Sequence, residues 1–302
     1  MNKKWYNAGI MCRDCGYIPK CTQCDITISY HLDHAGQLFG ICHICKMTYN
    51  TMKDCHKCHG HHTTYYGMGL QKIAEYLTQT FGIIPVIVDS DTTNSQIKTT
   101  KRIQIIQQTP APLIVLGTSL LSTPPQGMVF DCLIFLNADV GLGVPDYHAA
   151  RYNFELLYET ITHHHSPVTI IQSHNPTHYS ILSACKLDQS GFEWQDDQYR
   201  QIHHYPPYSE LCVIMYKNEI ESNLFITVNK LHQELIYMTN KNNLTDLEIF
   251  ATPPLVYKKF GKYRYHIIIK GKEIRKWIDQ RYVELNMYHR GFKLDRNPRN
   301  IV

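Results

Sequence analysis

The sequence lacks long apolar segments and carries little net charge. No run of eighteen apolar residues occurs, which excludes a membrane-spanning helix, and residues 1–6 offer no apolar stretch of the kind that a secretory signal needs. We therefore expect a cytoplasmic protein with no membrane partner. Thirty Lys and Arg against 26 Asp and Glu leave a net charge of +4 over 302 residues, and this balance by itself excludes no class of partner.

Motifs of nucleotide hydrolysis are also missing. The chain contains no Gly-x4-Gly-Lys-Ser/Thr loop, whose backbone N–H groups cradle phosphates, and no Asp-Glu dipeptide that could hold Mg²⁺. Although 18 histidines are present, no elbow-type motif supports a Ser/His/Asp or Cys/His nucleophile. We expect no catalytic residues in this chain and no ATP bound by this chain alone.

Cysteine, by contrast, is abundant: eleven are present, and eight form Cys-x-x-Cys pairs within the first 58 residues. The pairs are Cys12/Cys15, Cys21/Cys24, Cys42/Cys45 and Cys55/Cys58. Each pair can offer two thiolates to a tetrahedral ion, so the eight sulfurs predict two structural zinc sites with four cysteines each. A disulfide framework is disfavoured in a cytoplasmic chain, and an iron–sulfur cluster is the main remaining alternative. Spacing alone does not say which pairs share an ion.

The other potential ligands have simpler interpretations. Cys132, Cys185 and Cys212 stand singly in apolar runs, and we interpret them as small core residues. Seven histidines lie within the cysteine-rich segment, but eight sulfurs already suffice for two ions, so we interpret these histidines as solvated groups or as neighbours of the ligands. They are His31, His34, His43, His56, His59, His61 and His62.

After the cysteines, apolar periodicity predicts an α/β arrangement. Leu70, Ile73, Ala74 and Leu77 recur at helical spacing and predict a helix that ends near Gly82. Further helices are predicted up to about residue 108 and over 147–161. Strands are predicted over 83–89, 113–116, 130–136 and 168–172. This alternation predicts a parallel sheet with helices on both faces.

Two consecutive prolines, Pro206 and Pro207, predict a domain boundary near residue 203. Beyond it the pattern reads strand, helix, strand, strand, helix, strand, which is the split βαβ, ferredoxin-like order of an α+β domain. The predicted ranges are 211–216, 220–237, 247–251, 263–269, 272–282 and 291–294.

Several short segments together carry a family resemblance. They are Cys12-Arg-Asp-Cys15-Gly-Tyr, Gly67-Met-Gly69, Asp89-Ser-Asp91-Thr92, Leu116-Gly117-Thr118, Asn137-Ala138-Asp139-Val-Gly141-Leu-Gly143-Val-Pro145-Asp146, Asn175-Pro176-Thr-His178-Tyr179, Tyr205-Pro206-Pro207-Tyr208, Gly261-Lys262-Tyr263-Arg264-Tyr265 and Asp295-Arg-Asn-Pro298. Over essentially the whole chain they resemble the PriA family, or primosomal protein N-prime, of bacterial replication-restart DNA helicases. The resemblance implies a degenerate RecA-like second helicase lobe (1–11 and 60–202), a double zinc-binding insertion (12–59) and an α+β C-terminal DNA-binding domain (203–302).

The resemblance also implies how the cysteines are shared and which partners to expect. In that family the pairs are nested, so one zinc would be bound by Cys12, Cys15, Cys55 and Cys58, and the other by Cys21, Cys24, Cys42 and Cys45. The implied partners are forked or single-stranded DNA, single-strand-binding protein and other primosome components.

The chain departs from the family where the motor chemistry resides. The family's arginine finger is worth about 10³ to 10⁵ in rate in NTPases generally, but here the equivalent stretch, 157–167, contains no arginine. Prolines in the segment 122–127 replace the family's element that couples nucleotide to DNA. We interpret His163, His164 and His165 as a loop released from its former duty rather than a metal site, because three consecutive residues cannot all face one ion.

The last fifty residues carry the remaining functional signal. Residues 256–302 hold thirteen Lys and Arg but only four Asp and Glu. Cations interleaved with aromatics suit phosphate contacts and base stacking, whereas the bland alternative is a solvated strand edge kept from aggregating by lysine. The candidate DNA-binding residues are Lys258, Lys259, Lys262, Tyr263, Arg264, Tyr265, Lys270 and Lys272.

These observations predict the zinc-containing, DNA-binding portion of a replication-restart helicase that cannot hydrolyse ATP or unwind DNA alone. Two alternatives remain open. One is a catalytically dead primosome scaffold without DNA binding, and the other is a helicase subunit completed by a separate ATPase-lobe chain.

Overall fold

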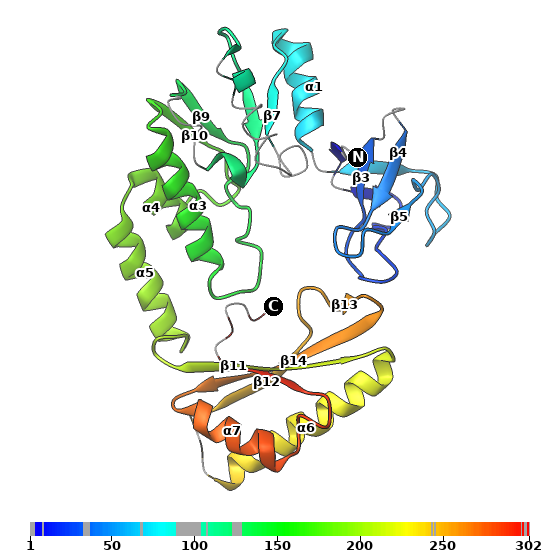
Figure 1. Cartoon of the computed structure of the whole chain (residues 1–302), viewed down its shortest axis with the longest axis vertical. Helices are drawn as coiled ribbons and strands as arrows, with labels where there is room; N and C mark the ends of the chain where they lie inside the picture. The colour runs from blue at the N-terminus through cyan, green and yellow to red at the C-terminus, as the bar shows by residue number, and fades with distance from the viewer. Residues whose placement is uncertain are drawn as a thin grey trace. The chain divides into compact units, whose positions relative to one another are not determined.

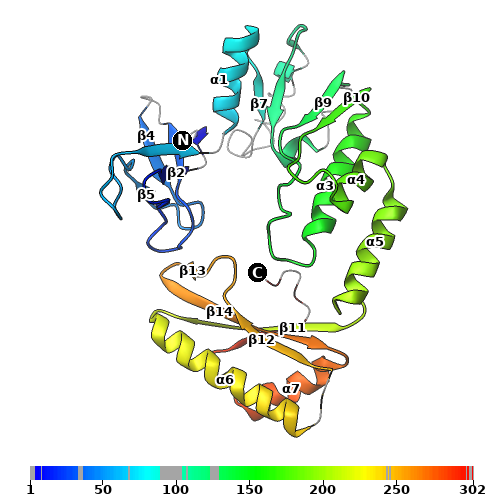
Figure 2. The same cartoon turned by 180° about the vertical axis from the view of Figure 1, so that it is seen from behind.

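The computed structural model describes residues 4–7, 9–32, 37–66, 69–88, 104–106, 108–122, 129–242, 244, 246–296, 298 and 301 (Figures 1 and 2). The chain forms two compact units. The first consists of Met1–Thr22, Ile26–Ile134 and Glu159–Ile170, and the second of Gln23–Asp25, Phe135–Tyr158 and Ile171–Val302. No helix in the described ranges has both the length and the apolar character of a membrane span.

The cysteine-rich segment folds into two small antiparallel sheets. One has four strands in the order β1 (Lys4–Asn7), β3 (Ser29–Leu32), β4 (Leu38–Ile41) and β5 (Thr48–Tyr49), and the other pairs β2 (Gly9–Cys12) with β6 (Thr63–Tyr66). Among the described residues of this segment, the buried apolar cluster has four members, Ile10, Ile28, Tyr30 and Met52, with Tyr17, Leu38 and Tyr49 packed against them. A core of this size is too small to stabilise about fifty residues rich in loops without another cross-link.

The alternating segment begins with helix α1 (Leu70–Phe81), whose predicted end is confirmed. Gly82 adopts a left-handed φ of 70° and donates its N–H to the Thr78 carbonyl. The helix therefore ends at a residue that tolerates the left-handed conformation. Strands β7 (Val86–Val88) and β8 (Val115–Gly117) follow and pair in parallel, and a 3₁₀ turn covers Ser119–Leu121. The predicted helix before residue 108 lies mostly outside the described residues.

Two further strands form a separate pair, β9 (Cys132–Phe135) and β10 (Val168–Ile171). The single parallel sheet expected from the sequence is therefore divided, within the described residues, into two two-stranded pieces. The expectation of helices on both faces is also wrong for this pair: Ile134 and Ile170 are each about half exposed, at 53% and 50%, so β9 and β10 are covered on one face only. A continuous apolar run does not distinguish such a strand from one buried on both faces.

Three helices frame the second unit's first core. Helix α3 (Ala149–His164) confirms the predicted helix, and α4 (Tyr179–Lys186) and α5 (Gln189–Ile202) were not predicted. Phe154 of α3 stacks on Phe192 of α5 with ring centroids 3.9 Å apart. The buried amide of Asn153 donates to the Ala138 carbonyl at 2.6 Å, which holds the preceding loop against α3.

The C-terminal domain has the predicted element order. It comprises β11 (Glu210–Asn218), α6 (Glu221–Lys241), β12 (Glu248–Thr252), β13 (Lys258–Lys259), β14 (Lys262–Gly271), α7 (Ile274–Glu284) and β15 (Lys293–Asp295). The sheet runs in the order β12-β14-β11-β15 with antiparallel neighbours, and β13 adds to the end of β14. Helices α6 and α7 lie on the same face of this sheet (Figures 1 and 2).

Strand alternation gives this sheet two different faces. Ile267 and Ile269 point toward the helices and join a core that includes Leu231 and Ile278. Ile268, between them, points to the other face and joins a smaller cluster, in which it packs with Leu211, Val213, Tyr147 and Ile301. The end of β14 near residue 268 is therefore covered on both faces. On the helix-free side, the buried cluster includes no residue from the opposite end of β14, near β13.

Candidate metal centres and nucleic-acid interface

Each Cys-x-x-Cys pair sits in the same tight turn. The backbone N–H of the first cysteine donates to the carbonyl five residues later, at 2.9 Å from Cys12 and Cys42 alike. The residue four positions after the first cysteine adopts a left-handed conformation in all four turns. These residues are Gly16, Asp25, Lys46 and His59, with φ between 49° and 71°. Only one is glycine, so three turns hold a conformation that side chains seldom adopt, and a tightly held site can compensate for that cost.

The strands explain which turns meet. Cys12 ends β2, which pairs with β6, and β6 begins shortly after Cys58; β3 pairs with β4 and joins the two inner turns. The resulting groups are Cys12, Cys15, Cys55 and Cys58, and Cys21, Cys24, Cys42 and Cys45. This is the nested arrangement that the family resemblance implies, and it follows from one antiparallel pairing enclosing another.

The sulfur positions fit one ion per group. Within each group all four Sγ atoms lie within 4.8 Å of one another. The Sγ atoms of Cys15 and Cys55 are 3.5 Å apart, and those of Cys12 and Cys58 are 3.6 Å apart. A tetrahedral ion with metal–sulfur bonds of about 2.3 Å keeps its sulfurs about 3.8 Å apart. A disulfide would need about 2.05 Å, so no disulfide links these cysteines.

Electrostatics also favour a cation. Burial raises the pKa of the Cys42 thiol, and Cys45 and Cys21 raise it further, because neighbouring thiolates would repel one another. A divalent cation reverses that preference and lets all four sulfurs ionise. Protein donors are already directed at the sulfurs: the Tyr49 hydroxyl donates to Cys21 Sγ at 3.0 Å, and the Lys57 N–H lies 3.4 Å from Cys55 Sγ. Since every ligand position is filled by sulfur, these groups suit a structural role and leave no place for substrate.

The described histidines of this segment belong to neither sulfur group. His34 lies outside the described residues. His61 and His62 are exposed and pair with carboxylates instead, Nδ1 lying 2.7 Å from Asp54 and 2.9 Å from Asp14 respectively. His31 is buried, and its ring lies 5.6 Å from that of His43.

The single cysteines divide into two kinds. Cys212 is fully buried, as expected of a core residue. The interpretation of Cys132 and Cys185 as core residues is wrong, because both are exposed. Their apolar neighbours belong to a strand and a helix that are covered on one side only, so the apolar run does not report the burial of each member.

The expected loop at the three consecutive histidines is only partly correct, because His163 and His164 form the end of helix α3 and His165 follows it. His164 is buried, its ring packs against Phe130, and its Nε2 lies 2.6 Å from the Leu121 carbonyl, to which it donates. His163 and His165 are exposed. The predicted divergence of three neighbouring side chains is therefore what the geometry shows.

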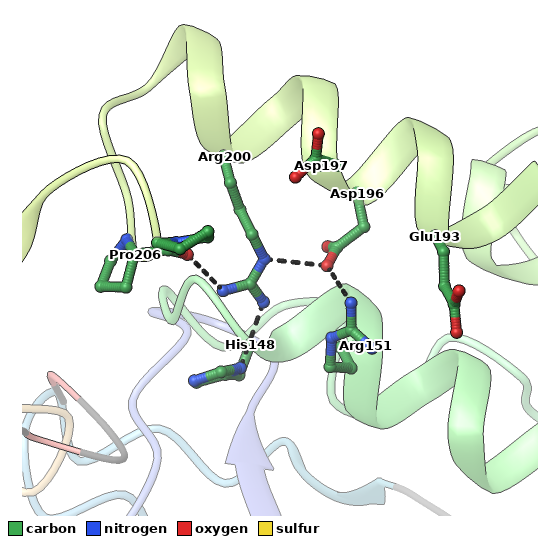
Figure 3. Close-up of a pocket in the computed structure, with 8 residues that line it drawn as sticks. His148, Arg151, Glu193, Asp196, Asp197, Arg200 and Pro206 are labelled. Atoms are coloured by element: carbon green, nitrogen blue, oxygen red, sulfur yellow. Dashed lines mark hydrogen bonds and ion pairs between the residues drawn. The ribbon is translucent and has the colours of Figure 1, made fainter.

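A pocket of about 420 Å³ in the second unit is organised by a buried carboxylate. Asp196 is fully buried and accepts from Arg151 at 2.7 Å and from Arg200 at 2.8 Å (Figure 3). Arg200 also donates to the Pro206 carbonyl at 3.1 Å and to His148 Nδ1 at 3.2 Å. Burial and the Arg200 charge lower the pKa of His148, which keeps that nitrogen available as an acceptor.

This cluster is a structural joint, because its charges are satisfied internally. Both arginines are bound to Asp196, and Arg200 ties helix α5 to the Pro206 segment that leads into the C-terminal domain. Neither guanidinium is therefore offered to a phosphate. The pocket lining also includes the acidic Glu193 and Asp197, which makes it unsuited to an anion.

Half of the predicted DNA-binding residues lie on the helix side of the sheet or inside the domain. Tyr263 and Tyr265 pack against the core under α6 and α7, so their rings are not presented to a ligand. Lys258 lies on the same side, its ammonium 4.7 Å from the Tyr263 ring centroid.

Lys270 is held inside the domain. Only 7% of it is exposed, and its ammonium donates to the His203 carbonyl at 2.9 Å, pairs with Glu248 at 3.0 Å and lies 4.9 Å from the Tyr205 ring. These partners show that the ammonium of Lys270 is satisfied within the domain. Lys272, two residues further along, is exposed.

Strand register places five cations on the sheet face opposite the helices, and we call this set the basic face: Lys217, Lys259, Lys262, Arg264 and Lys293. β11 pairs Lys217 with Arg264, and β13 pairs Lys259 with Lys262. Their strand neighbours pack toward the helices, so these side chains point away from them, and the same holds for Lys293 of β15. All but the half-buried Arg264 are exposed. Sequence reasoning missed Lys217 and Lys293 because strand pairing, which alone brings them to this face, is not visible in local spacing.

The metal content of the chain tests the assignment of the two sulfur groups as metal sites. We expect two equivalents of zinc per chain by elemental analysis, because each sulfur group fits one tetrahedral ion. Cys15→Ser and Cys45→Ser should each reduce the content to about one and lower the unfolding temperature. Cys185→Ser, an exposed cysteine outside both groups, is the matched control and should retain two. Full metal content in either ligand variant would contradict the assignment.

Stability measurements test the buried carboxylate. Asp196→Ala leaves two guanidinium groups without their partner, and Arg200 is nearly buried, so we expect the free energy of unfolding in urea to fall by about 3–5 kcal/mol. Glu193→Ala, an exposed acidic residue on the same helix, should change it by less than about 0.5 kcal/mol. Equal effects of the two variants would show that the cluster is not the joint described above.

Comparison with known proteins gives a consistent result. No protein-family model matches the chain. Replication restart protein PriA of Bacillus subtilis (strain 168) is 30% identical over 99% of this chain and 38% of the relative. PriA of Chlamydia pneumoniae is 29% identical over 89% of this chain and 36% of the relative, and PriA of Borreliella burgdorferi is 24% identical over 95% and 45%.

The chain thus spans less than half the length of the curated relatives it matches. The similarity extends over almost the whole of this chain, from the cysteine-rich segment through the C-terminal domain. The chain is therefore related to the C-terminal region of the PriA replication restart proteins.

Proposed function

We propose that this chain is a zinc-containing, DNA-binding counterpart of part of a replication-restart protein, and that it acts without ATP hydrolysis of its own. The observation that carries the proposal is the basic face of the C-terminal domain in a chain related to PriA over nearly its full length. Forked or single-stranded DNA is the proposed ligand. Single-strand-binding protein, other primosome components and a separate ATPase lobe are the proposed protein partners.

Zinc is the proposed metal. Sulfurs within 4.8 Å of one another leave room for one ion and not for a cluster of several irons. The two ions would cross-link a segment whose apolar core has four buried members, which is how small metal domains obtain their stability.

The proposed domain assignments rest on strand order and strand pairing. The strand order β12-β14-β11-β15 with both helices on one face supports the split βαβ assignment for residues 203–302. The parallel pair β7 and β8 beside helix α1 supports a remnant of a RecA-like lobe in 1–11 and 60–202, with the double zinc-binding insertion at 12–59.

The exposed cations of the basic face support the DNA-binding proposal. Lys217, Lys259 and Lys293 are exposed on one sheet face, and the ion pair of Lys262 with Glu219, at 3.2 Å, is exposed and therefore weak. Such a set of cations neutralises a nucleic-acid backbone and releases its counterions, which makes binding depend steeply on salt. The burial of Lys270 removes one cation from the set expected from the sequence.

Salt dependence tests this proposal. If about five phosphates are neutralised, raising salt from 50 to 200 mM should weaken binding of a forked oligonucleotide by about 10²- to 10³-fold, measured by fluorescence anisotropy. The double variant Lys259→Ala/Lys262→Ala should weaken binding and reduce the slope of log K against log salt by about two. The control is Lys230→Ala/Lys241→Ala on helix α6, which keeps the same net charge as the test variant. No binding at low salt would instead favour the scaffold without DNA binding.

ATP hydrolysis provides an independent test. The sequence has no P-loop, and the end of α3 carries histidines where an arginine finger would be needed. We expect phosphate release from ATP to stay at the background rate with or without forked DNA. Turnover by this chain alone, retained after a second purification step, would contradict the proposal.

A further inference from the structure

The β13–β14 hairpin ends in a turn that is unusual for its sequence. β13 pairs Lys259 with Lys262, so only Phe260 and Gly261 lie in the turn. Both have positive φ, 51° and 79°, which is the two-residue turn that matches the twist of a hairpin. Asparagine, aspartate or glycine normally occupies the first position, because side chains with bulk are strained there.

Burial does not account for a phenylalanine at this position. Phe260 is 60% exposed and belongs to none of the apolar clusters formed by the described residues. The ring therefore gains little from the fold, while the backbone beneath it is held in a conformation that a smaller residue would adopt more easily. The Gly261 N–H donates to the Gln23 carbonyl at 2.9 Å, which holds the turn but leaves the Phe260 ring exposed. A strained backbone beneath an exposed ring motivates the hypothesis of a ligand contact, because such strain clusters at ligand-binding positions.

The surroundings of the ring indicate the chemistry of that ligand. The Lys259 ammonium lies 5.4 Å from the ring centroid, and the exposed Lys262 follows the turn on the neighbouring strand. An aromatic face beside cations is the combination with which proteins hold unpaired nucleotides, since the base stacks while the phosphates meet the charges.

We propose that Phe260 stacks on a base of an unpaired DNA strand that runs along the basic face. The inference rests on the proposed DNA binding and adds to it a specific contact with an unpaired base. In a duplex the base faces are occupied by stacking on their neighbours, so the contact is available only to single-stranded segments, including the unpaired arm of a fork. The hairpin tip thereby distinguishes unpaired DNA from paired DNA, whereas the lysines bind both.

Direct binding measurements test the stacking. We expect Phe260→Ala to weaken binding of the full chain to a single-stranded oligothymidylate by about fivefold to 150-fold, because that is the range for loss of one stacked base. Binding to a duplex of equal length should change less than twofold. Tyr237→Ala, which removes an equally exposed ring (67%) from helix α6, is the matched control and should affect neither ligand.

A second variant separates the ligand contact from a structural role. Phe260→Asn suits the left-handed turn, so it should raise the unfolding temperature by about 2–4 °C while it lowers affinity for the single strand as much as Phe260→Ala does. Phe260→Trp should retain or increase that affinity. An oligonucleotide with abasic sites, which keeps its phosphates, should bind wild type and Phe260→Ala equally.

The outcomes distinguish this inference from the proposed function. If the lysine double variant weakens binding but Phe260→Ala does not, DNA binding stands and the stacking is refuted. Equal losses on single strand and duplex, or a Phe260→Asn variant that binds like wild type, would also overturn it. If the wild-type chain binds no DNA at low salt, both proposals fail together.

Discussion

Eight sulfurs gathered in two tight groups are the constraint on which the N-terminal part of the structure depends. Four cysteine side chains within 4.8 Å of one another are unfavourable as thiolates without a cation and make poor packing as thiols. The apolar core beside them has only four buried members, so it cannot account for the order of the loops that carry the ligands. One metal ion in each group would supply that cross-link, and the nested strand pairs β2–β6 and β3–β4 position the sulfurs for it.

Local sequence determines much of this architecture. The Cys-x-x-Cys spacing predicted the ligands, and the apolar periodicity predicted the elements of the C-terminal domain, because both depend on residues close in sequence. Helix α5 was missed because its apolar residues are few: Phe192 is fully buried in a helix whose other members are mostly polar. Helix α4 was missed because its eight residues are too short for a helical period to stand out. The stability of α5 comes from tertiary contacts, among them the Asp196 ion pairs, and no local pattern reports them.

The candidate nucleic-acid site was predictable only in outline. The surplus of positive charge after residue 256 located the domain, but composition does not say which cations are exposed. Strand alternation decides that question: it sends Tyr263 and Tyr265 to the helix side and Arg264 to the opposite face. Lys270 lies on the same sheet face as Arg264, but at the other end of β14, where neighbouring residues cover it. Pairing between β11 and β14 brings in Lys217, which is more than forty residues away in sequence.

The same alternation explains why Phe260, and not the tyrosines of β14, becomes available to a ligand. Tyrosines in the middle of β14 gain free energy by packing under α6 and α7, so turning them outward would expose apolar surface. Phe260 lies beyond the last paired residues, where no core is within reach and a left-handed backbone is required. An exposed ring at that position costs stability in two ways, through its backbone and through its contact with water. A chain without selective use for the ring would lose nothing by replacing it with asparagine, and this asymmetry makes the hairpin tip the most informative single position in the domain.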